Sequence, residues 1–209
     1  MARHAGAIPA VAETYPMHSH PTTLINIFGG PGIGKSTFAA LLFAALKMRD
    51  ASVEITTEYA KDLLRDGRGH VLSEDQIEVF AAQRRRHRRL LGKVNLAITD
   101  SPVLLCSIYA PAHYPQSYHD LVRWAHDEIP SVNLLLQRHA GPYEVEGRIH
   151  SETVARAIDQ AINALLERYA IPHHRVPAGR AGISASLGIL EQAGLLPPAP
   201  PHVQDRLPL

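Results

Sequence analysis

The feature that most constrains the fold is a glycine-rich run, Gly29 to Thr37, which reads GGPGIGKST. It has four residues between two glycines, followed by Lys and Ser. A strand-like run (22–28) precedes it and a helix-like run (38–48) follows, which is the context this spacing requires. Glycine lets the backbone wrap closely round an anion, and the amides then meet it at the positive end of the helix. The run predicts a phosphate-binding loop.

The loop residues have separate expected roles. Lys35 is expected to reach the β- and γ-phosphates of ATP, and the Ser36 hydroxyl to ligate Mg²⁺. The alternative is a glycine-rich turn that binds nothing, which the flanking strand and helix disfavour. The predicted nucleotide-binding residues are Gly29, Gly30, Pro31, Gly32, Ile33, Gly34, Lys35, Ser36 and Thr37.

Short apolar runs alternate with helical patterns along the chain, which predicts a parallel sheet covered by helices. The expected fold class is α/β, a P-loop NTPase fold with a five-stranded parallel sheet and helices on both faces. Ser73 is expected to cap one helix and Ser151 another, since serine is a preferred cap. The expected strands cover residues 22–28, 52–57, 94–99, 132–137 and 173–176.

One domain is expected over residues 22–196. Residues 1–21, rich in Ala, His and Pro, are predicted to be a flexible extension, and residues 197–209 a Pro-rich tail. The single cysteine, Cys106, excludes an internal disulfide and fits a reducing compartment. No apolar run has the length of a membrane span, and the first residues lack a signal peptide's apolar core. We therefore expect a cytoplasmic protein without a membrane partner.

Polar residues follow the expected strands, at the edge where such sheets bind ligands. Asp100 is expected to hold Mg²⁺ together with Ser36; the alternative is a helix cap, with Pro102 in the first turn. Glu58 is a candidate general base for an acceptor hydroxyl; the alternative is a glutamate stabilised by the helix dipole. The sequence does not decide whether Glu58 or Asp100 is the base.

The segment 138–150 has no period and lies between a strand and a helix, where a mobile lid is expected. Arg138 and Arg148 flank it and are predicted to neutralise charge on the transferring phosphoryl group. The alternative is an ordinary surface loop with solvated arginines.

The sharpest charge feature is the run Arg84 to Arg89, although the net charge is only +1. On a helix, Arg84 and Arg88 share one face. One face of the run is expected to grip phosphates of a nucleotide or of DNA, with a solvated basic helix as the alternative. The predicted substrate contacts are Gln83, which is expected to read a base edge, with Arg84, Arg85 and Arg88.

Two classes of P-loop protein are disfavoured by what the chain lacks. It has no NKxD motif, and Asp100 at the end of its strand is followed by Ser-Pro-Val instead of completing the DxxG switch of a regulatory GTPase; Ser101 stands where an AAA motor usually carries a water-activating Glu. The layout favours a small kinase, in which the acceptor is a hydroxyl or phosphate and water is excluded.

Four stretches, FGGPGIGKST, TTEYAKDLL, ITDSPVLL and PYEVEGR, resemble small phage-encoded P-loop kinases grouped with the AAA-like domain of nicotinamide riboside kinases. The resemblance covers roughly residues 22–177 and is greatest to phage kinases of 5-hydroxymethyluracil in DNA. It implies phosphoryl transfer from ATP to the hydroxymethyl group, a step in thymidine hypermodification, in the host cytoplasm. Two alternatives stay open: a nucleoside or deoxynucleoside monophosphate kinase, and an ATP-hydrolysing nucleotide switch.

Overall fold

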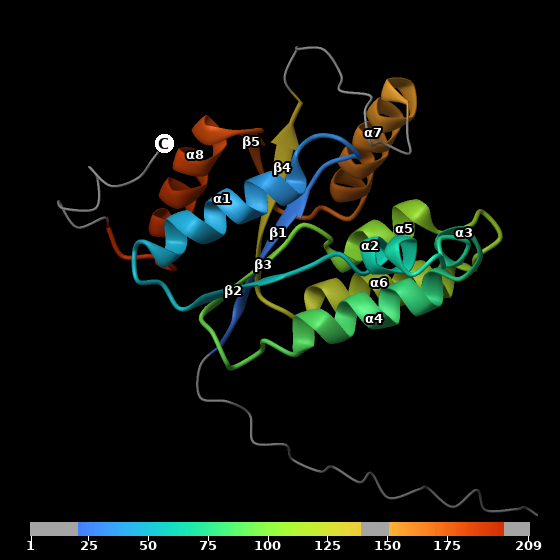
Figure 1. Cartoon of the computed structure of the whole chain (residues 1–209), viewed down its shortest axis with the longest axis horizontal. Coiled ribbons are helices and arrows are strands. Elements are labelled where there is room, and N and C mark those ends of the chain that lie inside the picture. The colour runs from blue at the N-terminus through green and yellow to red at the C-terminus, as the bar shows by residue number, and fades with distance from the viewer. Residues whose placement is uncertain (1–20, 139–150, 199–209) are drawn as a thin grey trace, which may run out of the picture.

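The protein is a single parallel sheet covered by helices on both faces, described here from a computed structural model (Figure 1). The structure describes residues 21–138 and 151–198. The expected extension 1–21 (apart from Pro21) and most of the tail therefore lie outside the described residues. The strands are β1 (Thr23–Phe28), β2 (Val53–Thr56), β3 (Leu96–Thr99), β4 (Ser131–Gln137) and β5 (His174–Pro177).

The five strands pair in the order β2-β3-β1-β4-β5, all parallel. The predicted α/β, P-loop NTPase-type fold is therefore confirmed. Strand β1 lies at the centre, with Ile25 opposite Ile98 of β3 on one side and Val132 of β4 on the other. This order brings the ends of β3 and β4 beside the loop that follows β1. We call the edge where the strands end the carboxyl edge, and the opposite one the amino edge.

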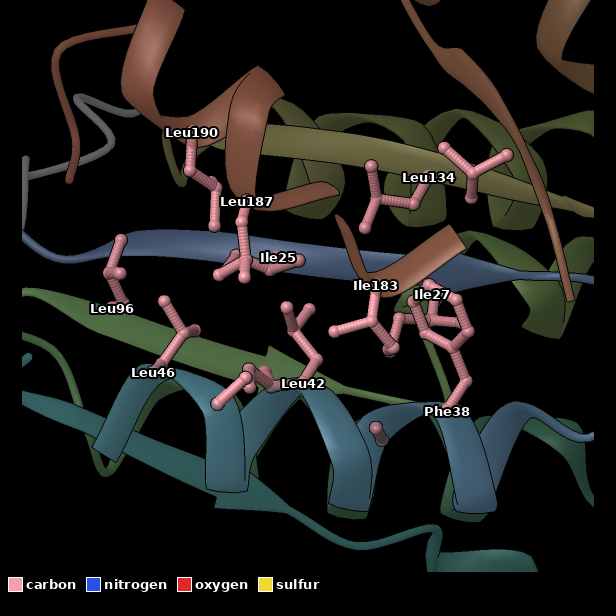
Figure 2. Packing of buried hydrophobic residues seen from close by; sticks show 14 of the residues in the cluster. Ile25, Ile27, Phe38, Leu42, Leu46, Leu96, Leu134, Ile183, Leu187 and Leu190 are labelled. Atoms are coloured by element: carbon pink, nitrogen blue, oxygen red, sulfur yellow. The ribbon is translucent and has the colours of Figure 1, made fainter. Parts of the chain in front are cut away.

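One face of the sheet is covered by two helices, α1 (Lys35–Lys47) and α8 (Arg180–Gln192) (Figure 1). Ile25 and Ile27 point from β1 toward this layer. Figure 2 shows their contact partners on the two helices, and burying these aliphatic and aromatic groups is the main stabilising term. The labelled partners are Phe38, Leu42, Leu46, Ile183, Leu187 and Leu190.

The other face carries the remaining helices, which form a second buried cluster with Phe28 and Leu135. These elements are α2 (Tyr59–Arg65), α3 (Val71–Glu74), α4 (Gln76–Arg88), a 3₁₀ turn η1 (Val103–Leu105), α5 (Cys106–Tyr109), α6 (Gln116–Asp127) and α7 (Glu152–Arg168). Cys106 is buried in this cluster, and burial raises the pKa of its thiol to about 12.

The two expected helix caps have different outcomes. Ser151 caps α7, because its hydroxyl accepts a hydrogen bond from the Val154 amide. The prediction for Ser73 is wrong: it lies inside the short helix α3, and α4 begins after Asp75, whose carboxylate accepts from two amides of the first turn. Asp is as good a cap as Ser, and the sequence pattern did not separate the two.

Candidate functional site

The glycine-rich run forms the turn between β1 and α1 that its spacing predicts. Gly29, Gly32 and Gly34 all have positive φ, a conformation that side chains disfavour. Helix α1 starts at Lys35 with no side-chain cap and no acidic residue in its first turn. Its first amides are therefore not capped by the protein's own carboxylates, which is the arrangement of an anion-binding helix terminus.

The Lys35 side chain folds back along the loop. Its Nζ donates to the Gly29 carbonyl at 2.8 Å and to the Gly30 carbonyl at 3.1 Å. Burial lowers the pKa of Lys35, and the charges of Glu58 and Asp100 oppose that shift. The ammonium group is thus held at the loop, near two carboxylates.

Ser36 and Asp100 meet at the carboxyl edge. The Ser36 hydroxyl donates to Asp100 Oδ2 at 2.6 Å, and the Asp100 side chain is 8% exposed. The alternative role of Asp100 as a helix cap is wrong, because Pro102 holds the cap position before η1 without a side-chain hydrogen bond. A hydroxyl and a carboxylate are oxygen ligands that suit Mg²⁺.

These two side chains supply only part of a coordination shell. Among residues 21–138 and 151–198 there is no group of three or more His, Cys, Asp or Glu side chains that could hold a metal. Mg²⁺ is commonly bound by one or two carboxylates together with substrate phosphates and water. The donor set therefore fits a metal that binds together with a nucleotide.

Lys61, on α2, is a site residue that sequence reasoning missed. Its Nζ donates to Ser36 Oγ at 2.6 Å and to Asp100 Oδ2 at 3.1 Å, and lies 3.3 Å from Glu58 Oε2. Burial lowers the pKa of Lys61, but the charges of Asp100 and Glu58 outweigh it, so the net shift is upward. The signal was present, since Lys61 follows Glu58 by three residues and such positions share a helix face.

Glu58 lies at the N-terminal boundary of α2 without making a side-chain cap. Its side chain is 29% exposed and forms an ion pair with Lys61. Tyr109, on α5, is 38% exposed, and partial desolvation together with the negative charges of Glu58 and Asp159 raises the pKa of its phenol. The site therefore contains a partly exposed carboxylate, Glu58, whose charge acts on the phenol of Tyr109.

Arg138 and Asp159 both bond to the phosphate loop and to each other. Arg138 Nε donates to Asp159 Oδ2 at 2.9 Å, and its Nη2 donates to the Pro31 carbonyl at 3.0 Å. The Gly30 amide donates to Asp159 Oδ1 at 2.6 Å. The structure thus brings the predicted residue Arg138 to the loop, whereas Arg148 and the rest of the expected lid lie outside the described residues.

Asp159 was missed, because an acidic residue on an amphipathic helix looks like an ordinary surface position. Its closeness to the loop is reflected at Gly30, where an added Cβ would lie 2.5 Å from Asp159 Oδ1 and 2.8 Å from the Ala155 carbonyl. Real Cβ atoms do not approach other atoms so closely, so Gly30 is required by this packing.

The arginines Arg84 and Arg88 are not brought to the phosphate loop. Arg84 Nη2 donates to Glu128 Oε2 at 2.5 Å, and Arg88 Nη1 lies 3.4 Å from Glu128 Oε1. Glu128 comes just before β4, so the pair lies toward the amino edge. Arg85 is exposed, and among the described residues no ion pair involves it.

Gln83 is buried, with 1% exposure, and the expectation that it reads a base edge is wrong for this structure. Its Oε1 accepts from the Tyr59 amide at 2.9 Å. Arg86, not among the predicted contacts, donates to the Thr57 carbonyl at 3.0 Å and pairs with Asp62. Gln83 and Arg86 therefore fix the start of α2, the helix that carries Lys61.

Comparison with known proteins bears on the family and the fold of the chain. The family model described as an AAA domain matches residues 24–182. Two solved structures of NadR protein are similar in fold, both with a TM-score of 0.64. The one in complex with NAD and AMP-PNP is 10% identical, and the match covers 82% of this chain and 49% of that chain. The one in complex with NR is 12% identical, and the match covers 82% of this chain and 51% of that chain. The chain thus spans about half the length of those NadR chains. No curated protein sequence matches it.

Within residues 21–138 and 151–198, no helix has the length and apolar character needed to span a bilayer.

Proposed function

We propose, from the premise that the chain belongs to the AAA domain family, that it is a kinase that transfers the γ-phosphoryl group of ATP to an alcohol. One observation carries this proposal: Lys35, Ser36, Asp100 and Glu58 converge where β1 and its neighbours end. The NadR complexes contain AMP-PNP, NAD and NR; at 10–12% identity they support the fold, and the extension to ATP is ours.

Each group has a proposed task. The amides of the loop and Lys35 bind the triphosphate. Ser36 and Asp100 hold Mg²⁺, which when bound neutralises developing charge on the phosphates. Arg138, whose guanidinium group donates to the Pro31 carbonyl of the loop, adds a second positive charge.

Glu58 is the proposed base. It takes the proton of the acceptor hydroxyl while the new O–P bond forms, the bond from the γ-phosphorus to the β,γ-bridging oxygen breaks, and ADP leaves. Two observations favour Glu58 over Asp100. The Asp100 side chain is 8% exposed and bonded to Ser36, whereas that of Glu58 is 29% exposed and paired only with Lys61 in the described structure.

The proposed acceptor is the hydroxymethyl group of 5-hydroxymethyluracil in DNA. The support is the sequence resemblance carried by the GGPGIGKST, EYAKD and TDSP stretches, together with the exposed arginines of α4. An acceptor base in DNA must leave the stack or be single-stranded to reach Glu58. Comparing transfer to single-stranded and duplex DNA of one sequence measures that requirement.

The experiment that tests the acceptor uses γ-labelled ATP with Mg²⁺ and three acceptors: DNA containing hydroxymethyluracil, free nucleosides, and deoxynucleoside monophosphates. We expect label on the DNA, with no transfer to the same DNA containing thymine. Label only on the free compounds would overturn the DNA assignment in favour of a nucleoside or nucleotide kinase. Phosphate release that no acceptor alters would instead support a hydrolytic switch.

A further inference from the structure

Lys61 places a positive charge among the oxygens that are proposed to serve Mg²⁺. Its ammonium group has three N–H donors and three oxygen partners, Ser36 Oγ at 2.6 Å, Asp100 Oδ2 at 3.1 Å and Glu58 Oε2 at 3.3 Å. The three partners come from α1, the residue that follows β3, and the start of α2. One cation therefore joins three elements at the carboxyl edge.

We propose that Lys61 is an internal cation that occupies the metal position of the nucleotide-free protein and competes with divalent ions for it. Two cations cannot share Ser36 and Asp100 at this distance without strong repulsion. Mg²⁺ binding thus requires Lys61 to leave, and the phosphates of a nucleotide supply the negative charge that makes the exchange favourable. The inference rests on the proposed Mg²⁺–nucleotide binding, and it adds a residue that sets when the metal binds.

The surroundings of Lys61 permit that exchange. Its side chain is 39% exposed, so the ammonium group can move into solvent without becoming a buried unpaired charge. Glu58 is on the same helix at i−3 and can keep the ion pair while Lys61 releases Ser36 and Asp100. Lys35 is not placed for this task, because its ammonium group donates to the Gly29 and Gly30 carbonyls, whereas that of Lys61 donates to Ser36 and Asp100.

Mn²⁺ binding to the nucleotide-free chain tests the proposal, measured by the Mn²⁺ electron paramagnetic resonance signal. Lys61→Gln is expected to bind Mn²⁺ about tenfold or more tightly than the wild type, because the competing charge is gone. Lys61→Arg, which keeps the charge, is expected to bind as weakly as the wild type. Adding Asp100→Asn to Lys61→Gln is expected to abolish the gain.

Arg65→Gln is the matched control, since Arg65 is a more exposed cation one turn further along α2 that pairs with Asp62. Equal Mn²⁺ affinity of wild type and Lys61→Gln, or the same gain in Arg65→Gln, would overturn the proposal. Lys61→Met serves as a second neutral variant should the glutamine variant fail to fold. No acceptor is used, so a failed kinase assay leaves this result standing, and a failed Mn²⁺ assay leaves the kinase assignment standing.

Discussion

Two charged clusters differ in where they lie relative to the phosphate loop. At the carboxyl edge, Glu58 and Lys61 of α2 meet Asp100, which follows β3, within hydrogen-bonding distance of Lys61. Toward the amino edge, Arg84 and Arg88 pair with Glu128. The second cluster is denser in the sequence, yet the first one lies beside the phosphate loop. For closeness to this loop, the strand end that a residue follows is therefore a better guide than charge density along the chain.

The largest expected effect belongs to Lys35 at the carboxyl edge. Lys35→Ala should reduce phosphoryl transfer by about 10³-fold, because it removes a positive charge aimed at the transferring group. Lys47→Ala is the matched control: Lys47 ends the same helix, pairs with Glu54 at 3.5 Å, and its loss should leave the rate unchanged. The steady-state rate of phosphoryl transfer from labelled ATP is measured for both variants. Equal losses of rate would mean that both changes disturb the folding of α1, and would contradict the prediction.

Glu58→Gln should lower kcat by about 10²-fold while ATP binding persists, since it removes the proposed base and leaves the phosphate loop intact. Glu54→Gln, an exposed change in strand β2, supplies the comparison. The measurement is kcat alongside ATP affinity from fluorescence titration. A variant that loses ATP binding but retains kcat would contradict the assignment of Glu58 as base.

His87 is a buried residue of α4 and makes stability depend on pH. It is 1% exposed, and burial lowers the pKa of its imidazole from 6.5 to about 4. Between those values the unfolded state binds more protons than the folded state, so stability falls as pH falls; above 6.5 the term is constant. From pH 7.5 to pH 5 the free energy of unfolding should drop by about 2 kcal/mol through this group.

Urea unfolding of the wild type and of His87→Gln at both pH values isolates that term, because glutamine does not titrate. His126 is also buried with a lowered pKa and is present in both proteins, so the difference between them reports His87 together with its electrostatic coupling to His126. The same pH dependence in both proteins would show that His87 is not held neutral.

The smallest effect concerns the exposed arginines of α4. Replacing Arg85 and Arg89 by Ala should weaken binding of a DNA oligonucleotide several-fold and reduce its salt slope by about two. Arg84→Ala is the contrasting change, since Arg84 already pairs with Glu128 and stacks on Trp124 at 5.0 Å. Fluorescence anisotropy at several salt concentrations measures both, and an unchanged slope would make the run a solvated surface.

The sequence predicted the fold and the phosphate loop because both depend on local patterns. Alternating apolar runs specify a parallel α/β sheet, and the glycine spacing specifies the turn before α1. The position of Asp100 beside the loop was predicted for the same reason, since it is a polar residue after a strand. The pairing of Lys61 with Glu58 could have been predicted from the sequence, since the two lie one helical turn apart. That pairing alone does not predict that Lys61 also contacts Ser36 and Asp100.

Other site features depend on tertiary packing that has no local signal. Asp159 reaches Gly30 only because β4 pairs with β1, and neither residue's neighbours in the sequence indicate the contact. Gln83, which precedes the arginine run, was expected to read a base edge, whereas α4 buries it against the start of α2. Strand order and helix rotation, which decided both cases, come from the whole chain.

The bond from the Gly30 amide to Asp159 joins residues 129 positions apart. During synthesis on the ribosome, the glycine-rich turn is made before α7, so Asp159 becomes available to it only later. A nascent chain that stops before α7 would carry the full signature motif and lack the carboxylate that fixes its first turn. One contact of this turn is therefore contributed by a helix that is made long after the turn itself.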